Sequence, residues 1–370
     1  MSVGIDKIGV YIPKYFLDIR CLAKARNVEE EKYTKGLMHD KMAISPVSQD
    51  IVSMGTMASL KILNEEDKKN IGLVIFATES SFDKSKAAST YIHSLLDLNP
   101  YCRTVEMKQA CFSATAGILM ARDYVKLNKN KKALVIASDI AKYEMKSPGE
   151  STQGSGSVAI LISENPKIAE IEENSVSYTK DVMDFYRPSQ YEYPKVDGKL
   201  SNEMYLHHLE VTYNAYVKEK NDTNFSNICF HVPYPKLALK AVKMVNKNLE
   251  DRYYDTVKLN SQVGNIYTGS LYLSLYSLLS NADYLKENDR IAMYSYGSGS
   301  VSEFFVLKLK KDFKKEKLDL ENRIELSIEE YEKIFYEKEV EDKEYENCTD
   351  EKVYLKGIFD SKRKYVINGK

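Results

Sequence analysis

The sequence is poor in the residues that build metal sites and disulfide frameworks. Its 370 residues include five cysteines and five histidines, and no two cysteines form a Cys-x-x-Cys pair. An odd, scattered set of thiols is typical of a reducing compartment and argues against structural zinc or disulfides. We therefore expect a cytoplasmic protein without a metal site. The cysteines are Cys21, Cys102, Cys111, Cys229 and Cys348.

Long hydrophobic runs and a strong charge of one sign are also absent. No stretch approaches the about 18 consecutive apolar residues that span a bilayer, and the first residues lack the pattern of a signal peptide. The net charge is −1 and the isoelectric point is near 6.6, so we expect neither nucleic acid nor a membrane as partner. The chain does contain 43% hydrophobic residues, enough for a large core in two or three domains or two fused halves.

Short apolar runs alternate with helical segments along the first half of the chain. Residues 72–78, 133–139 and 157–163 are apolar runs bounded by turn residues, which predicts fully buried strands. The other elements expected in this half are a strand at 3–12, a partly helical segment at about 22–54, and helices at 51–63 and 87–96. Such alternation predicts an α/β protein.

Cys111 stands where a strand turns into a helix. Apolar and polar residues alternate up to Met107, as in a strand, and the small residues 113–117 lead into an apolar helical stretch. At a helix N-terminus, the backbone N–H groups and the helix dipole favour a thiolate and can hold an oxyanion on a bound thioester. We therefore expect a nucleophile at Cys111, with a buried core thiol as the alternative.

The second half of the chain repeats features of the first. Residues 154–158 and 297–301 both read Gly-Ser-Gly-Ser-Val, and each opens an apolar strand. A small-residue turn precedes a buried helix in both halves, at 111–117 and 264–270, and Asn265 stands in the second turn as the cysteine does in the first. This predicts related halves whose turns face each other across one site, unless the glycine–serine turns match by chance.

The two halves are expected to divide near residue 165. We predict one half at 1–165 and a second at 166–370, which includes a charged appendage from about residue 310. Charges of both signs at 310–346 indicate a solvated appendage of helix and hairpin, with partial disorder as the alternative. The segment 178–201 indicates a long irregular excursion. The other expected elements are strands at 225–233, 291–296 and 301–307 and helices at 236–249 and 268–285.

Three residues of reactive type each follow a predicted strand, namely Glu79, Cys111 and His231. Sites in α/β sheets form at that end of the strands. A thiolate attacks thioesters, a carboxylate in an apolar pocket acts as a general base, and an imidazole polarises a carbonyl or moves a proton. Each also has an ordinary explanation, since Glu79 could neutralise a helix dipole and His231 could be a structural histidine.

A series of short stretches carries a resemblance to a known family. They are Gly4–Ile8 with Tyr11–Lys14, Asp50–Gly55, Ala77–Ser80, Glu106–Cys111, Thr152–Gly156, Val196–Ser201, Phe230–Pro233, Val263–Tyr272 and Ser295–Ser300. In this order they resemble the bacterial 3-hydroxy-3-methylglutaryl-CoA synthases of the mevalonate pathway. The resemblance extends to about Leu309, which is nearly all of the chain before the charged appendage.

The resemblance implies a duplicated thiolase-like fold in α-β-α-β-α layers, usually as a homodimer. It implies that Cys111 carries the acyl group, that Glu79 is the general base and that His231 meets acetoacetyl-CoA. The substrate-binding residues that it implies are Tyr143, Asn265 and Ser298 at the acetoacetyl pocket, Thr152 and Ser201 at the thioester, and Lys236 and Lys240 near the CoA phosphates. The two lysines also lie four residues apart on one predicted helix face, for which a solvated face is the alternative.

The implied enzyme condenses acetyl-CoA with acetoacetyl-CoA and water, through an acetyl-cysteine, to give 3-hydroxy-3-methylglutaryl-CoA and CoA. It needs no cofactor besides these CoA thioesters. The nearest alternative is a relative that acts on carrier-protein-bound acyl groups in polyketide β-branching, although no basic docking patch is evident. A thiolase would need a second cysteine near the turn 297–301, an initiating ketoacyl synthase would lack Glu79, and a non-catalytic scaffold would not retain all three reactive residues.

Overall fold

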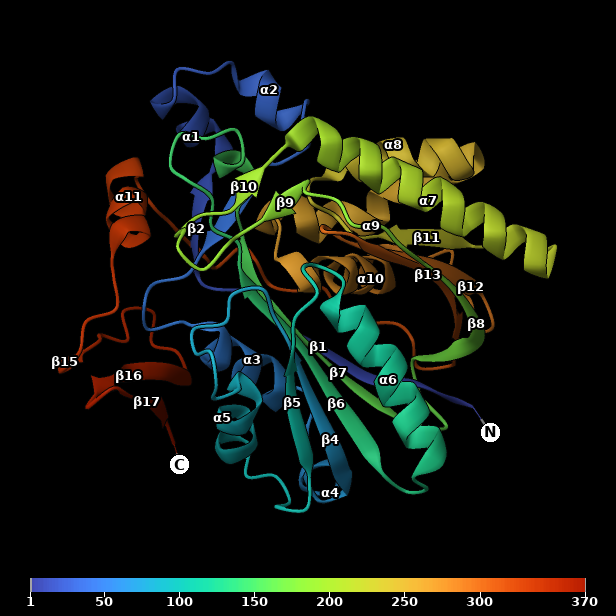
Figure 1. Cartoon of the computed structure of the whole chain (residues 1–370), viewed down its shortest axis with the longest axis horizontal. Helices are drawn as coiled ribbons and strands as arrows, with labels where there is room; N and C mark the ends of the chain where they lie inside the picture. Colours follow the sequence, from blue (N-terminus) through green and yellow to red (C-terminus); the bar gives the residue numbers. More distant parts are fainter. Residues whose placement is uncertain (1, 370) are drawn as a thin grey trace.

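A large mixed sheet organises the molecule, which is described here by a computed structural model of residues 2–369. Its strands are β1 (Val3–Tyr11), β4 (Ile71–Ala77), β5 (Arg103–Met107), β6 (Lys132–Ile140), β7 (Ser155–Glu164), β8 (Ala169–Thr179), β11 (Asn227–Phe230), β12 (Arg290–Gly297) and β13 (Val301–Leu309). They pair in the order β11-β12-β13-β8-β1-β7-β6-β4-β5 (Figure 1). The apolar runs predicted as buried strands are β4, β6 and β7, so these predictions are confirmed.

The two ends of the sheet repeat one pairing pattern. In β4-β6-β7-β1 the first pair is parallel and the next two are antiparallel, and β11-β12-β13-β8 repeats this sequence of pairings. The two sets meet where Gly4 and Ile5 of β1 pair with Glu170 and Ala169 of β8. The topology supports the predicted internal repeat, whereas a division of the chain after residue 165 stays a prediction.

Helices cover both faces of each set of strands. They are α3 (Ile51–Leu60), α5 (Ala88–Leu95), α6 (Ser113–Leu127), α7 (Gly198–Lys220), α8 (Pro235–Val245), α9 (Glu250–Val263) and α10 (Ser270–Asn281). Because side chains of a strand alternate between its faces, Phe76 of β4 packs with α3 and α5 while Ile75 faces α6. In β12, Met293 shares a core with α10 and Tyr294 shares one with α7 and α8. Helices α6 and α10 therefore form a central layer, and the order of layers is α-β-α-β-α.

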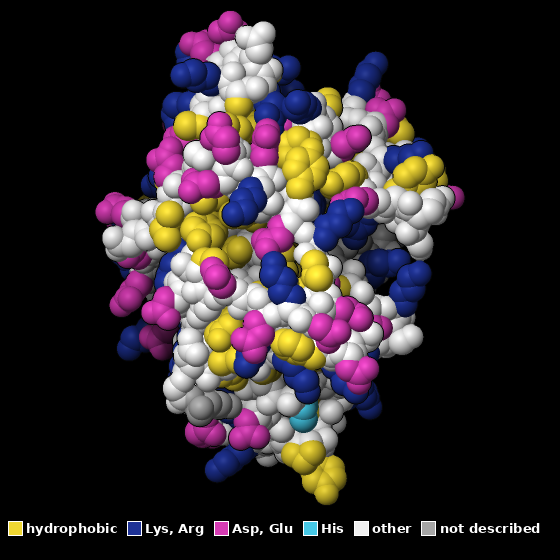
Figure 2. Space-filling view, turned by 90° about the vertical axis from the view of Figure 1, so that its left-hand side faces the viewer, with side chains coloured by type: hydrophobic (Ala, Val, Ile, Leu, Met, Phe, Trp, Pro, Cys, Tyr) yellow, Lys and Arg dark blue, Asp and Glu magenta, His cyan; other side chains and the backbone are white. Residues whose placement is uncertain are grey.

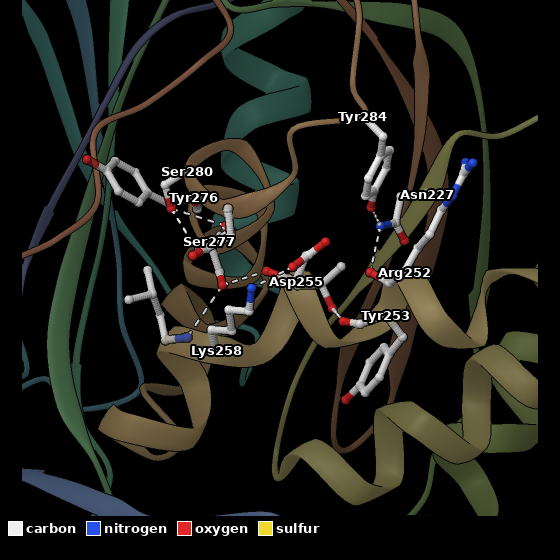
Figure 3. A network of polar contacts seen from close by, with 12 residues as sticks. Asn227, Arg252, Tyr253, Asp255, Lys258, Tyr276, Ser277, Ser280 and Tyr284 are labelled. Atoms are coloured by element: carbon white, nitrogen blue, oxygen red, sulfur yellow. Dashed lines mark hydrogen bonds and ion pairs between the residues drawn. The ribbon is translucent and has the colours of Figure 1, made fainter.

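Polar contacts fix α9 against α10 (Figure 3) and against α8. The Ser277 hydroxyl in α10 donates to the backbone oxygen of Asp255 over 2.7 Å. Asn227, at the start of β11, donates to the Arg252 backbone oxygen over 3.0 Å and to the Tyr284 hydroxyl over 2.7 Å. The Tyr253 hydroxyl donates to the backbone oxygen of Pro235, the first residue of α8. These bonds anchor the chain on both sides of His231.

The charged appendage is folded onto the body. It contains β14 (Ile324–Glu325), α11 (Ile328–Tyr336), β15 (Lys343–Glu344), β16 (Val353–Phe359) and β17 (Lys362–Ile367). A helix is present within 310–346 as predicted, whereas the hairpin of β16 and β17 lies beyond that stretch. The hairpin docks through Tyr365 and Arg363, which contact Asp50 over 2.6 and 3.0 Å. On this side of the molecule, charges of both signs are interspersed with apolar side chains (Figure 2).

Some elements differ from the sequence-based expectation. The segment 22–54 was expected to be helical in parts and does contain short helices, but Lys41–Ile44 forms β3, which pairs with β2 (Tyr15–Asp18). Strand β8 and helices α7 and α9 were not foreseen. The remaining short elements are α1 (Ile19–Ala25), α2 (Glu30–Thr34), α4 (Glu65–Asn70), β9 (Phe185–Tyr186), β10 (Lys195–Val196), η1 (Glu150–Thr152), η2 (Lys247–Leu249) and η3 (Tyr267–Gly269). Within the described residues, every helix is too short or too polar to cross a bilayer.

Candidate active site

Cys111 lies in a tight turn between β5 and α6, as predicted. Ala110 adopts a left-handed φ of +44°, and the Ser113 hydroxyl closes the turn by donating to the Ala110 backbone oxygen over 2.9 Å. The end of β12 lies directly against this turn, because a Cβ on Gly297 would come within 2.7 Å of both the Phe112 Cβ and the Gln109 oxygen. Only glycine fits at position 297, so the second half of the chain supports the turn that carries the thiol.

The Cys111 thiol donates to Oε1 of Glu79 over 2.9 Å. Glu79 follows β4, and Arg187 donates to its backbone oxygen over 2.7 Å. Burial, followed by the charge of Asp139, raises the pKa of Glu79 to about 8, while the bond from Cys111 opposes the rise. Two predicted site residues from separate strand ends are thus in direct contact.

The resting thiol is not favoured as a thiolate, contrary to the expectation from its turn position. Burial raises the pKa of Cys111, and the neighbouring carboxylates of Glu79, Asp139 and Asp184 raise it further. Burial, together with the nearby acidic groups, therefore outweighs the helix N-terminus. The thiol therefore keeps its proton, beside a carboxyl group that can accept it once that group is ionised.

Asp139 organises the site, although the sequence analysis did not single it out. This fully buried residue near the end of β6 accepts hydrogen bonds through Oδ1 from the backbone N–H groups of Glu79, over 2.7 Å, and Ser80, over 3.1 Å. Its Oδ2 accepts from the Thr268 backbone N–H over 3.2 Å. Burial raises the pKa of Asp139 to about 7. Its position at the end of a predicted buried strand is the signal that could have identified it.

The two small-residue turns face each other, as the repeat predicted. Thr268, in the second turn, accepts a hydrogen bond through Oγ1 from the backbone N–H of Ala114 at the start of α6, over 2.7 Å. Asn265 is buried, and its backbone N–H donates to the Thr152 oxygen over 2.9 Å. The turns that carry Cys111 and Asn265 are therefore fixed to one another by direct bonds between the halves.

His231 follows β11 and is anchored at its backbone. Its N–H donates to the Tyr294 oxygen over 2.8 Å, and its own oxygen accepts from the Tyr205 hydroxyl over 2.7 Å. The next residue of β12, Ser295, accepts from Thr115 in the first turn of α6 over 2.8 Å, so β12 links His231 to the cysteine turn. The imidazole is 2% exposed, burial lowers its pKa to about 3, and within residues 2–369 its Nδ1 has no hydrogen-bond partner.

A cavity of about 240 Å³ opens beside the Glu79–Cys111 pair. Its lining combines the turn before Cys111 with the irregular segment 178–201 and the turn after β12, and includes Glu79, Gln109, Ala110, Phe185, Arg187, Tyr267 and Ser298. Asp184 supports the wall, because it accepts from the Tyr296 hydroxyl and the Gly299 N–H, each over 2.9 Å. A larger cavity of about 550 Å³ lies between the appendage and the body, away from these residues.

The predicted substrate-binding residues fall into two groups. Tyr143 packs edge-on against Tyr267 and Phe185, and burial together with Cys111 and Glu79 raises its pKa, so its phenol lies close to the pair. Thr152 and Asn265 are joined by a backbone hydrogen bond, and Ser298 lines the cavity. The second group lies on the neighbouring helices, with half-buried Ser201 in the first turn of α7, and half-buried Lys236 and exposed Lys240 one turn apart on α8.

Comparison with known proteins assigns the family. A model of the N-terminal part of hydroxymethylglutaryl-coenzyme A synthases matches residues 1–167, and a model of their C-terminal part matches residues 170–248 and 238–363. The hydroxymethylglutaryl-CoA synthase of Enterococcus faecalis is 42% identical over 354 residues, which cover 91% of this chain and 92% of that protein.

The chain belongs to the hydroxymethylglutaryl-CoA synthase family.

Further similarities agree with this assignment. The crystal structure of an HMG-CoA synthase complexed with CoA superposes with a TM-score of 0.95, at 41% identity, over 99% of this chain and 100% of the other. A 3-hydroxy-3-methylglutaryl-ACP synthase of polyketide biosynthesis, PksG of Bacillus subtilis, is more distant, at 33% identity over 90% of this chain and 88% of its own. The membership confirms the predicted resemblance, enzyme class and thiolase-like fold.

Proposed function

We propose that the chain condenses acetyl-CoA with acetoacetyl-CoA and water to give 3-hydroxy-3-methylglutaryl-CoA and CoA, as a step of the mevalonate route to isoprenoids. The observation that supports this most directly is the 2.9 Å contact between the Cys111 thiol and the Glu79 carboxylate. A nucleophile bonded to a base of raised pKa is the combination that acyl transfer followed by carbon deprotonation requires.

The first step forms an acetyl-enzyme. Glu79 accepts the thiol proton while the Cys111 sulfur attacks the carbonyl carbon of acetyl-CoA, and CoA leaves with a proton. Because the Cys111 pKa is raised, the sulfur stays protonated until substrate arrives. Once ionised, a carboxylate with a pKa of about 8 is a stronger base than an ordinary carboxylate.

The second step forms the carbon–carbon bond. Glu79 removes a proton from the methyl group of the acetyl-cysteine, and the resulting enolate attacks the ketone of acetoacetyl-CoA. The backbone N–H groups of Phe112 and Ala114 are already bonded, to Gln109 and Thr268, so we assign the enolate oxygen to the N–H of Cys111 itself. His231, held neutral by its low pKa, orients and polarises the ketone as a hydrogen-bond donor. The alkoxide that forms takes the proton from Glu79, and water then hydrolyses the thioester bond to Cys111, which gives the carboxyl group of the product and the free thiol.

The remaining assignments follow from the same reaction. Tyr143, Asn265 and Ser298 line the acetoacetyl pocket, Thr152 and Ser201 contact the thioester, and Lys236 and Lys240 bind the CoA phosphates. No resident cofactor is assigned, since the thioester already acidifies the methyl group. A cytoplasmic location fits the thiol usage of the sequence.

A homodimer is part of the proposal. Strand β5 forms an outer edge of the sheet. Its Val105 is 39% exposed, and Met120 on the adjacent α6 is 56% exposed. An open edge strand with apolar side chains is a ready surface for pairing with another strand. A second copy is the proposed partner. Light scattering should give twice the chain mass of 42.4 kDa, and a monomer at micromolar concentration would contradict this.

The direct test uses purified protein, acetyl-CoA and acetoacetyl-CoA. We expect free CoA and 3-hydroxy-3-methylglutaryl-CoA in equal amounts, identified by mass, together with acetylated Cys111 when acetoacetyl-CoA is omitted. An acetylated acyl carrier protein serves as the competing donor. Product from the carrier-bound donor, and none from acetyl-CoA, would overturn the proposal in favour of the β-branching reaction.

A further inference from the structure

The C-terminal appendage reaches into the loop that carries Tyr143 and Thr152. On α11, the Tyr331 side chain is 1% exposed, and its hydroxyl lies between two buried side chains of that loop. It accepts a hydrogen bond from Nε2 of Gln153 over 2.9 Å and donates to Oε1 of Glu150 over 3.2 Å. The other end of the Gln153 amide accepts from the Tyr143 backbone N–H over 2.7 Å.

These bonds form one directional chain from the appendage to the site. Each group uses the role that its chemistry allows, since the carboxylate accepts, the hydroxyl donates and accepts, and the amide nitrogen and oxygen point opposite ways. Gln153 is 3% exposed, and its neighbour Thr152 bonds Asn265 of the second half. The position of Tyr143 therefore depends on a side chain nearly two hundred residues away in the sequence.

A buried ion pair lies at the far end of this series of hydrogen bonds. Arg26 binds Glu150 with two nitrogens, Nε to Oε2 at 3.0 Å and Nη2 to Oε1 at 2.8 Å, and reaches Glu332 of α11 at 2.7 Å. Lys142, next to Tyr143, donates to the backbone oxygen of Phe335 over 2.5 Å. The appendage thus forms hydrogen bonds with both ends of the loop 142–153.

We propose that Tyr331 is a positioning residue, through which α11 of the appendage holds Tyr143 and Thr152 in place against the Glu79–Cys111 pair. The expected effect on KM rests on the proposed function, whereas the expected effect on the loop rests on geometry alone. Without the hydroxyl, a buried amide and a buried carboxylate each lose a partner, and the loop relaxes to satisfy them. The charged tail is then part of the substrate-binding machinery.

The kinetic test compares Tyr331→Phe with Tyr336→Phe, which removes a hydroxyl from the same helix at a residue that is 57% exposed. For Tyr331→Phe we expect the KM for acetoacetyl-CoA to rise about tenfold, with one acetyl group still bound per Cys111. Gln153→Leu should raise the KM to a similar extent. The double variant should raise the KM little further, because both changes break the same series of hydrogen bonds. A KM within twofold of wild type, or additive effects, would overturn the proposal.

The structural test needs no substrate. Backbone hydrogen exchange of the peptide containing Tyr143 should be faster in Tyr331→Phe than in wild type and unchanged in Tyr336→Phe, since only the first loosens the acceptor of the Tyr143 N–H. Unchanged exchange in Tyr331→Phe would overturn the positioning role whatever the kinetics. A wild-type protein that made no product would instead refute the proposed function, while faster exchange would leave the appendage–loop coupling standing.

Discussion

The carboxylate of Asp139 accepts a hydrogen bond of 2.7 Å from the backbone N–H of Glu79. This bond holds Glu79 beside the buried Asp139 at neighbouring strand ends, and desolvation, followed by the charge of Asp139, raises the pKa of Glu79 to about 8. The base of the proposed reaction is therefore tuned by a residue that need not touch substrate.

Replacing Asp139 with Asn tests this tuning. The substitution removes a negative charge that raises the pKa of Glu79, so Glu79 should ionise at a lower pH. The acidic limb of the kcat profile should then move to lower pH, and the rate should fall because the amide cannot accept all of the bonds of the carboxylate. A lower rate with an unmoved acidic limb would show that Asp139 supports the loop without tuning the base.

The raised pKa of Cys111 can be tested by alkylation. At pH 9, where the carboxyl of Glu79 is ionised, we expect iodoacetamide to modify Cys111 slowly, because only the thiolate reacts. In Glu79→Gln the adjacent charge is lost, the pKa of the thiol falls, and alkylation should become several-fold faster. Mass spectrometry of the Cys111 peptide measures the rate, with exposed Cys21 as an internal reference. Equal rates for Cys111 in the two proteins would contradict the acidic environment of the thiol.

The same charges predict how stability varies with pH. The pKa of Glu79 is raised in the folded protein from 4.5 to about 8, so its contribution is fully present below pH 4.5 and is lost as pH rises through 8. Glu79→Gln removes this loss and should raise the Tm by about 2–5 °C at pH 9, with little change at pH 5. Thermal unfolding at both pH values measures the difference. A Tm below that of wild type at pH 9 would show that the ionised carboxylate of Glu79 does not destabilise the folded protein.

The close contact at Gly297 gives a steric prediction. A methyl group there would collide with Phe112 and Gln109, so Gly297→Ala should shift the cysteine turn and lower kcat by about a hundredfold. The cost in stability should be about 1–3 kcal/mol, as for other overpacked sites. Gly198→Ala is the matched control, because no atom lies within 4 Å of a Cβ built there. If both variants kept wild-type activity, β12 would not be the support of the turn.

The sequence was sufficient for the elements that have a strong local signal. The strands β4, β6 and β7 are nearly continuous apolar runs, and the turn at Cys111 is marked by small residues between two distinct periodicities. In contrast, β8 alternates apolar and polar residues only at its two ends, because the polar residues Glu172, Glu173 and Asn174 stand consecutively in its middle, and much of its length is only half-buried. Helix α7 has a diluted apolar face, and the four residues of β3 are too few for periodicity.

The candidate site was only partly accessible from the sequence. Residue types at strand ends identified Glu79, Cys111 and His231, but their distances depend on how the two halves close. The resting protonation of Cys111 was misjudged, because a turn position reveals the helix dipole and not the acidic side chains that Asp139 and Asp184 bring from elsewhere. Tyr331 carries no local signal at all, since its role depends on the docking of the appendage.

The measurement that tests the account most directly separates the two half-reactions in Glu79→Gln. Because loss of the carboxylate lowers the pKa of the thiol, intact-protein mass spectrometry should still show one acetyl group on Cys111 after incubation with acetyl-CoA. Addition of acetoacetyl-CoA should then yield 3-hydroxy-3-methylglutaryl-CoA at least about a hundredfold more slowly than in wild type, since no base removes the methyl proton. Condensation at the wild-type rate would contradict the assignment of Glu79 as the base in contact with Cys111.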